Sequence, residues 1–109
     1  MTESKINLEK LDSEFKKYGL ITVDEIIGEW WFEITNIKLA IKVGKTTNGL
    51  YRSITNYKIK VKSNQIQFNG VCLRDNIESA VKDLLLEFFG YWTNYKQEQL
   101  ELESNEFWR

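Results

Sequence analysis

Apolar residues recur along this chain at two different spacings, which predict helices near its ends and strands between them. Over residues 8–18 the apolar side chains repeat every three or four positions. Asn7 is placed to cap the start of a helix, and Gly19 is placed to end it. Over residues 37–43 every second side chain is apolar, and the residues between them are lysine, alanine and lysine. We therefore expect a first helix and, later, a strand with one buried face.

Two further elements are predicted between that helix and that strand. Thr22 and Glu25 have the spacing of a capping box, in which each side chain satisfies a free backbone N–H at a helix start. Two isoleucines follow before Gly28, so we expect a short second helix over residues 22–28. Residues 30–35 are rich in aromatic and β-branched side chains, which favour a strand.

Parity of the apolar positions predicts the register of two hairpins. A two-residue loop at the Asn-Gly pair would place Leu39 opposite Lys58, whereas a three-residue loop over residues 47–49 places Leu39 opposite Tyr57. We therefore expect the longer loop, which also sets Ile37 opposite Ile59. The second hairpin closes at residues 63–64 and pairs like with like: Val61 with Ile66, Ile59 with Phe68, and Lys60 with Gln67.

A long helix is predicted after the strands. Residues 75–78 repeat the capping signature. An apolar stripe at helical spacing follows and consists of Ile77, Ala80, Val81, Leu84, Leu85 and Phe88. We expect an α+β fold: an antiparallel meander of three to four strands with helices packed on one face, in the order α-(α)-β-β-β-α. Residues 1–109 would form a single domain, with residues 91–109 as a looser helical or extended tail.

Charge is segregated along the chain although the net charge is only -1. Residues 36–63 hold seven lysines or arginines and no acid, while residues 77–109 hold seven acids and three bases. The predicted register places six of these bases on one outer sheet face: Lys38, Lys42, Arg52, Lys58, Lys60 and Lys62. Such a face can bind a partner, or it can protect the sheet against aggregation through its edges.

The C-terminal region combines aromatic and acidic side chains. Its candidate contact residues are Tyr91, Trp92, Tyr95, Glu101, Glu103, Phe107 and Trp108. These aromatic residues could fold back to complete the core. Alternatively, they could form an interface, because tryptophan and tyrosine carry much of the energy of desolvated contacts.

The inventory of reactive groups is poor. The chain has no histidine and one cysteine, Cys72, and it shows no glycine-rich phosphate loop. We therefore expect no catalytic residues, no metal ligands, no cofactor and no enzymatic activity.

The first 17 residues include no apolar run, and no segment approaches the roughly 20 apolar residues of a membrane span. We expect a cytoplasmic protein that does not interact with membranes.

These observations favour a small, non-enzymatic protein-binding module. In type, the chain is similar to small accessory proteins of phages and mobile elements, including inhibitors of host defence such as anti-CRISPR proteins. The partner would be a larger protein, for example a nucleic-acid-handling enzyme, and a homodimer is also compatible. The alternative is a nucleic-acid-binding module that uses the basic sheet face. However, sheets that hold single strands present aromatic residues, which here are expected to point inward.

Overall fold

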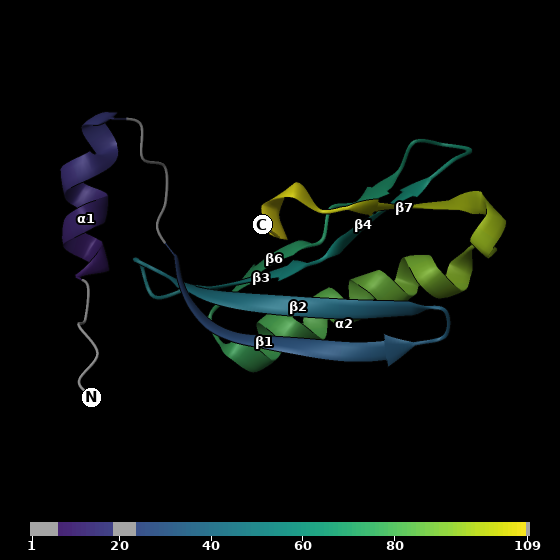
Figure 1. Ribbon diagram of the computed structural model, residues 1–109, viewed down its shortest axis with the longest axis horizontal. Coiled ribbons are helices and arrows are strands. Elements are labelled where there is room, and N and C mark those ends of the chain that lie inside the picture. Colours follow the sequence, from purple (N-terminus) through teal and green to yellow (C-terminus); the bar gives the residue numbers. More distant parts are fainter. Residues whose placement is uncertain (1–6, 19–23, 109) are drawn as a thin grey trace.

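The fold consists of two antiparallel sheets and a long helix. The computed structural model describes residues 7–18 and 24–108, and Figure 1 shows how the elements are arranged. In chain order the elements are α1 (Leu8–Phe15), η1 (Lys16–Tyr18), β1 (Asp24–Ile34), β2 (Ile37–Thr46), β3 (Tyr51–Thr55), β4 (Tyr57–Val61), β5 (Gln67–Phe68), β6 (Val71–Arg74), α2 (Ile77–Asn94), η2 (Gln97–Gln99), β7 (Leu100–Ser104) and η3 (Glu106–Trp108). The large sheet has the order β1-β2-β3-β6, and the small sheet has the order β5-β4-β7. The α+β class predicted from the sequence is confirmed.

The first helix begins where the sequence predicts. The side-chain Oδ1 of Asn7 accepts a hydrogen bond from the backbone N–H of Lys10 at 3.0 Å, which is N-cap geometry. The helix continues into η1, and Gly19, which we expected to end it, lies outside the described residues. Figure 1 shows α1 set apart from both sheets.

The prediction of a second helix is wrong over the residues that the structure describes. Asp24 begins β1, which runs to Ile34 and pairs with β2 along its length, with an irregularity between Ile26 and Gly28. Thr22, the expected cap, lies outside the described residues. A capping box is worth about 1 kcal/mol, and the ladder with β2, together with the strand preference of two isoleucines and two tryptophans, outweighs it. The strand expected over residues 30–35 therefore starts six residues earlier.

The first hairpin has the predicted register. The backbone N–H of Thr46 donates to the carbonyl of Leu50 at 2.8 Å, so that residues 47–49 form the loop. Gly49 has a φ of 84°, a left-handed conformation that glycine adopts without steric cost. The pairing then continues through β2 and β3 as far as Ile41 and Thr55.

Beyond this point the predicted pairs do not form, because the chain leaves the large sheet at Asn56. The Asn56 side chain takes the place of the next ladder residue: its Oδ1 accepts from the N–H of Ala40 at 2.9 Å, and its Nδ2 donates to the carbonyl of Lys38 at 3.0 Å. The backbone is thereby free to turn away into β4. The strand that we expected to be continuous is thus split between two sheets.

The small sheet is built around β4. On one side β4 pairs with β5 in the predicted register, with Ile59 opposite Phe68 and Lys60 opposite Gln67. On the other side it pairs with β7, so that residues 100–104 fold back onto the body of the protein. Figure 1 shows β7 lying beside β4. Residues 100–104, which we expected in a looser tail, are therefore an integral part of the small sheet.

Helix α2 supplies one wall of the core. Its N-cap is Asn76, one residue later than expected, whose Oδ1 accepts from the N–H of Ser79 at 2.8 Å. Three residues of the predicted apolar stripe, Ala80, Leu84 and Phe88, are fully buried, which confirms this part of the prediction. Ile77, at the start of the helix, is instead exposed.

The core lies between α2 and one face of each sheet. Its buried members are Leu39, Ile41, Val43, Ile59, Val61, Phe68, Cys72, Leu84, Phe88 and Leu100. The hydroxyl of Ser53 on β3 donates to the carbonyl of Ala80 on α2 at 2.7 Å, which marks the face of the large sheet that α2 covers. We call the opposite side the open face of the large sheet.

Candidate interaction surface

The basic residues identified from the sequence belong to two different sheets. Lys38 and Lys42 lie on β2 and Arg52 on β3, all in the large sheet, whereas Lys58 and Lys60 lie on β4 in the small sheet. Lys62 follows the end of β4 and is exposed. The break at residue 56 therefore prevents these side chains from forming the one continuous face that we expected.

Two bases of the large sheet, Arg52 and Lys42, have partners within the protein. The guanidinium of Arg52 lies 2.6 Å from a carboxylate oxygen of Asp24. The ammonium of Lys42 donates to the backbone carbonyl of Trp108 at 2.8 Å and lies 4.2 Å from the centre of the Trp108 ring. A cation over a tryptophan face is attracted by the ring quadrupole. Lys42 thus anchors the C-terminal turn η3 to the open face.

The bases of the small sheet lie beside the acids of the C-terminal region. Lys58 is opposite Glu103, and Lys60 is opposite Glu101. Cross-strand pairs of opposite charge stabilise a sheet by up to about 1 kcal/mol each. Lys58 also forms an ion pair with Glu106 at 2.9 Å, and the hydrogen bond from Lys58 lowers the pKa of that carboxyl. The charges that are segregated in the sequence are therefore brought together by the fold.

Most of the C-terminal aromatic side chains pack against the core. Tyr91, Trp92 and Tyr95 are partly buried there. The Trp92 ring stacks on Phe88 with centroids 5.7 Å apart, and the Tyr91 hydroxyl donates to the carbonyl of Gln67 at 3.2 Å. Burial raises the pKa of that Tyr91 hydroxyl. These three side chains thus complete the core, which was one of the two alternatives for this region.

Phe107 and Trp108 form a different group at the C-terminal end. Phe107 is 61% exposed, and Trp108 is half-buried. The rings of Trp108 and Trp31 meet edge to face with centroids 6.3 Å apart. Trp31 belongs to β1, so this contact joins the edge strand of the large sheet to η3.

The open face of the large sheet carries exposed apolar side chains. The ladders place Trp31 beside Ala40, Ile54 beside Val71, and Arg52 beside Leu73, and partners in a ladder share a face. The exposed large apolar residues of this face and of η3 form the candidate interaction surface: Ile26, Trp31, Val71, Leu73 and Phe107. Trp31 is 60% exposed.

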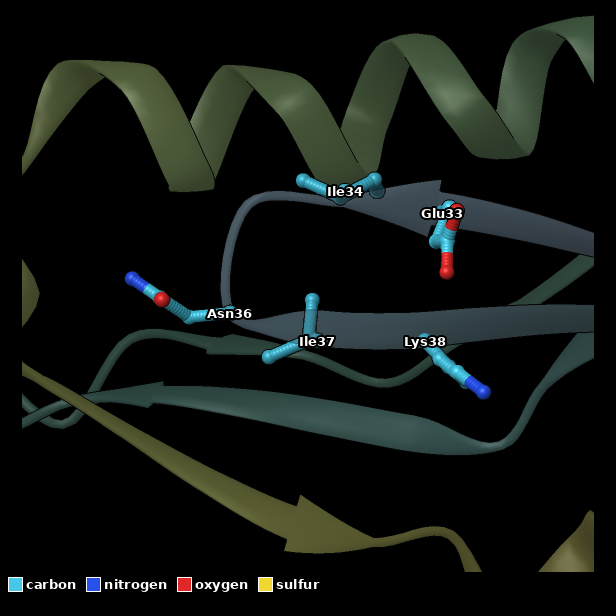
Figure 2. Close-up of a pocket in the computed structure, with 5 residues that line it drawn as sticks. All are labelled: Glu33, Ile34, Asn36, Ile37 and Lys38. Atoms are coloured by element: carbon cyan, nitrogen blue, oxygen red, sulfur yellow. The ribbon is translucent and has the colours of Figure 1, made fainter.

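A shallow pocket lies at the turn between β1 and β2, at one end of the large sheet. Figure 2 shows the five residues that line it, with Glu33 and Lys38 pointing to the same side of the hairpin. Asn36 has a φ of 73°, a left-handed conformation that asparagine tolerates in a tight turn. The carboxylate of Glu33 and the ammonium group of Lys38 can form ionic contacts with a ligand at this open pocket. The five lining residues include no serine, threonine or cysteine that could act as a nucleophile.

Groups that could support chemistry are few in the described part of the chain. Cys72 is buried on β6, and burial raises the pKa of its thiol, so the reactive thiolate is disfavoured. Across residues 7–18 and 24–108, no three histidine, cysteine or acidic side chains are grouped so as to hold a metal ion. This region also includes no helix with the length and apolar content of a membrane span.

Sequence reasoning missed most of the candidate interaction surface. Ile26 was assigned to a helix, and Val71 and Leu73 were not assigned to a surface. The available signal was the pair of adjacent tryptophans at residues 30–31. Successive side chains of a strand point to opposite faces, so one of these two rings had to point away from α2. The comparisons with known proteins give no further guide: no family model, no curated protein and no solved structure matches this chain.

Proposed function

We propose that this protein is a non-enzymatic protein-binding module that contacts its partner through the candidate interaction surface. The observation that carries the proposal is the exposure of Trp31 on the open face and of Phe107 on η3, at 60% and 61%. Contiguous exposed apolar surface is characteristic of interaction sites, and aromatic residues are enriched in their centres.

The charge distribution favours a protein partner over nucleic acid. Arg52 and Lys58 are each paired with an acid, and Lys42 is engaged by Trp108. Binding of phosphates depends on bases that can replace condensed counterions, and bases already paired contribute less. Glu29 and Glu33 are also exposed on the open face and would repel a phosphate backbone. Nucleic-acid binding is therefore the second candidate.

In its finer form, the proposal is that the protein inhibits a larger partner in the cytoplasm by occupying its surface, as accessory proteins of phages and mobile elements do. Its support is the absence of histidine from these 109 residues, together with an apolar surface suited to contact. The partner could be a nucleic-acid-handling enzyme, in which case binding would block access of its substrate.

The test is capture of a defined partner with matched surface variants. Tagged protein is incubated with a lysate of the organism that encodes it, and the retained proteins are identified by mass spectrometry. Phe107→Ser and Trp31→Ser should each reduce recovery of the specific partner. Leu86→Ser is the control, because Leu86 on α2 is also 61% exposed but lies on another surface.

Two outcomes would contradict the proposal. Equal recovery of the partner by all four proteins would exclude the candidate interaction surface as its contact site. Loss of the partner after nuclease treatment, together with direct binding of labelled DNA or RNA with a steep salt dependence, would favour the nucleic-acid alternative.

A further inference from the structure

The outer edge of β1 is open over residues 25–34. In the described part of the chain, β1 pairs only with β2, and no backbone hydrogen bond joins the other edge of residues 25–34 to another residue. An edge strand presents unpaired N–H and C=O groups that can receive another strand. Long open edges are usually shortened, covered or charged, because they otherwise recruit other chains.

Two tryptophans flank this edge on both faces of the sheet. Trp30 and Trp31 are 40% and 60% exposed. Because they are adjacent in a strand, Trp30 lies on the side of α2 and Trp31 on the open face. A strand added beside β1 would cover both rings at once. Protection of the edge alone does not require exposed aromatic residues, and it would be served better by charged ones.

The charge of β1 is entirely acidic. Glu25, Glu29 and Glu33 are exposed, and the strand has no basic residue. None of these three carboxylates forms an ion pair with another described residue, although Glu29 accepts a hydrogen bond from the indole N–H of Trp31 at 2.9 Å. A strand that carries lysine or arginine at the matching positions would therefore gain cross-strand pairs of opposite charge.

The existing neighbour of β1 shows which sequence pattern fits it. Residues 38–42 of β2, Lys-Leu-Ala-Ile-Lys, lie opposite residues 29–33 of β1. The two lysines face Glu33 and Glu29, and the three apolar residues face the aromatic positions between them. An antiparallel strand on the outer side of β1 would meet the same alternation of side chains.

We propose that β1 binds, by strand addition, an extended segment of the partner in which two basic residues enclose three apolar or β-branched residues. This inference rests on the proposed function and specifies the chemistry of the partner. Strand addition gives affinity through main-chain hydrogen bonds and specificity through alternate side chains. A second copy of this chain is a poorer occupant, because pairing β1 with itself would bring six glutamates into one seam without a base.

The test uses a synthetic peptide and a reversal of charge. The peptide Gly-Lys-Val-Thr-Val-Lys-Gly, labelled with fluorescein at its N-terminus and amidated at its C-terminus, is titrated with the full chain and followed by fluorescence anisotropy. The same peptide with glutamate at both lysine positions should bind at least about tenfold more weakly. Combining Glu29→Lys with Glu33→Lys should reverse this preference. Combining Glu87→Lys with Glu98→Lys, two exposed acids elsewhere, changes the net charge equally and should preserve it.

The binding site is then located by hydrogen exchange. The amides of residues 24–34 should be protected when the lysine peptide is bound, and circular dichroism should show that each variant keeps its fold. Lack of saturable binding up to about 1 mM would overturn the inference. So would an unchanged preference in the charge-reversed variant, protection confined to another element, or a dimer formed through β1.

The two proposals can fail independently. Capture of a partner that depends on Phe107, together with failure of the peptide, would contradict strand addition and leave the proposed function intact. Binding of the peptide to β1 without any captured partner would support strand addition and contradict the proposed function. The edge variants and the Phe107 variant alter different groups, which keeps these outcomes apart.

Discussion

Asn105 connects three segments of the chain, and replacing it with alanine should destabilise the fold. Its side chain is only 1% exposed. The Nδ2 group donates to the carbonyl of Asn69 at 3.1 Å, and Oδ1 accepts from the N–H of Phe107 at 3.1 Å. The backbone N–H of Asn105 also donates to the carbonyl of Asn56 at 2.9 Å. The residue therefore fastens η3 both to the turn before β6 and to the point where the chain changes sheets.

The magnitude follows from the groups that Asn105→Ala would leave unpaired. The carbonyl of Asn69 and the N–H of Phe107 would each lose their side-chain partner, while the carbonyl of Gly70 would keep its bond from the N–H of Thr55. A buried polar group without a partner costs about 1 to 3 kcal/mol. Both of these bonds are only partly buried, so the two groups together predict a loss of about 2 to 3 kcal/mol in the free energy of unfolding.

Urea denaturation, followed by tryptophan fluorescence, measures this loss. Asn105→Asp should also destabilise the protein near neutral pH, because it keeps the acceptor but turns a carboxylate oxygen toward the carbonyl of Asn69. Asn64→Ala is the matched control: Asn64 is exposed and accepts one bond from the N–H of Ile66, so its loss should stay within about 1 kcal/mol. If Asn105→Ala were no more destabilising than this control, the assigned role of Asn105 would be refuted.

Three further predictions concern the core and one ion pair. Phe88→Ala should lower the free energy of unfolding by about 3 to 5 kcal/mol, because the ring is fully buried; an unchanged urea midpoint would contradict the assigned core. Cys72 should react slowly with a disulfide reagent at neutral pH until the protein unfolds, because burial raises the pKa of its thiol; rapid labelling of native protein would refute this. Lys58 lowers the pKa of Glu106 below its ordinary 4.5, so their pairing should stabilise the fold above that pH and be lost as the pH falls through the lowered pKa. An NMR titration should find the Glu106 pKa higher in Lys58→Gln than in the wild type, and equal values would exclude this role of Lys58.

The parts of the fold that could be predicted are those set by local alternation. The registers of both hairpins followed from parity, because a shift by one residue would turn every apolar side chain of a strand toward solvent. The apolar stripe of α2 was equally clear, since Leu84 and Phe88 are separated by one helical turn. In these segments the local sequence and the tertiary structure favour the same conformation.

The errors arose where a long-range contact determines the structure. The capping signature before Gly28 is local, and it contains no information about the ladder that β1 forms with β2. The change of sheet at Asn56 depends on hydrogen bonds to residues 38–40, which a strand pattern does not reveal. Of the candidate interaction surface, the sequence identified only Phe107, and it identified the basic residues of the sheets without their partners. Lys58, for example, meets acids that lie more than 40 positions later.

The pairing of β4 with β7 has a consequence for how the protein is synthesised. During translation β4 is complete well before residues 100–104, which form its second neighbour, have been made. In that interval one edge of β4 lacks its partner strand, and Ile59 and Val61 lie on a strand not yet completed as a sheet. We expect the like charges of the lysines at residues 58, 60 and 62 to disfavour pairing between two nascent chains through this edge. The lysines of β4 would thus protect the nascent chain against association until β7 is synthesised. The glutamates of β7 then lie opposite the lysines of β4 within the same chain.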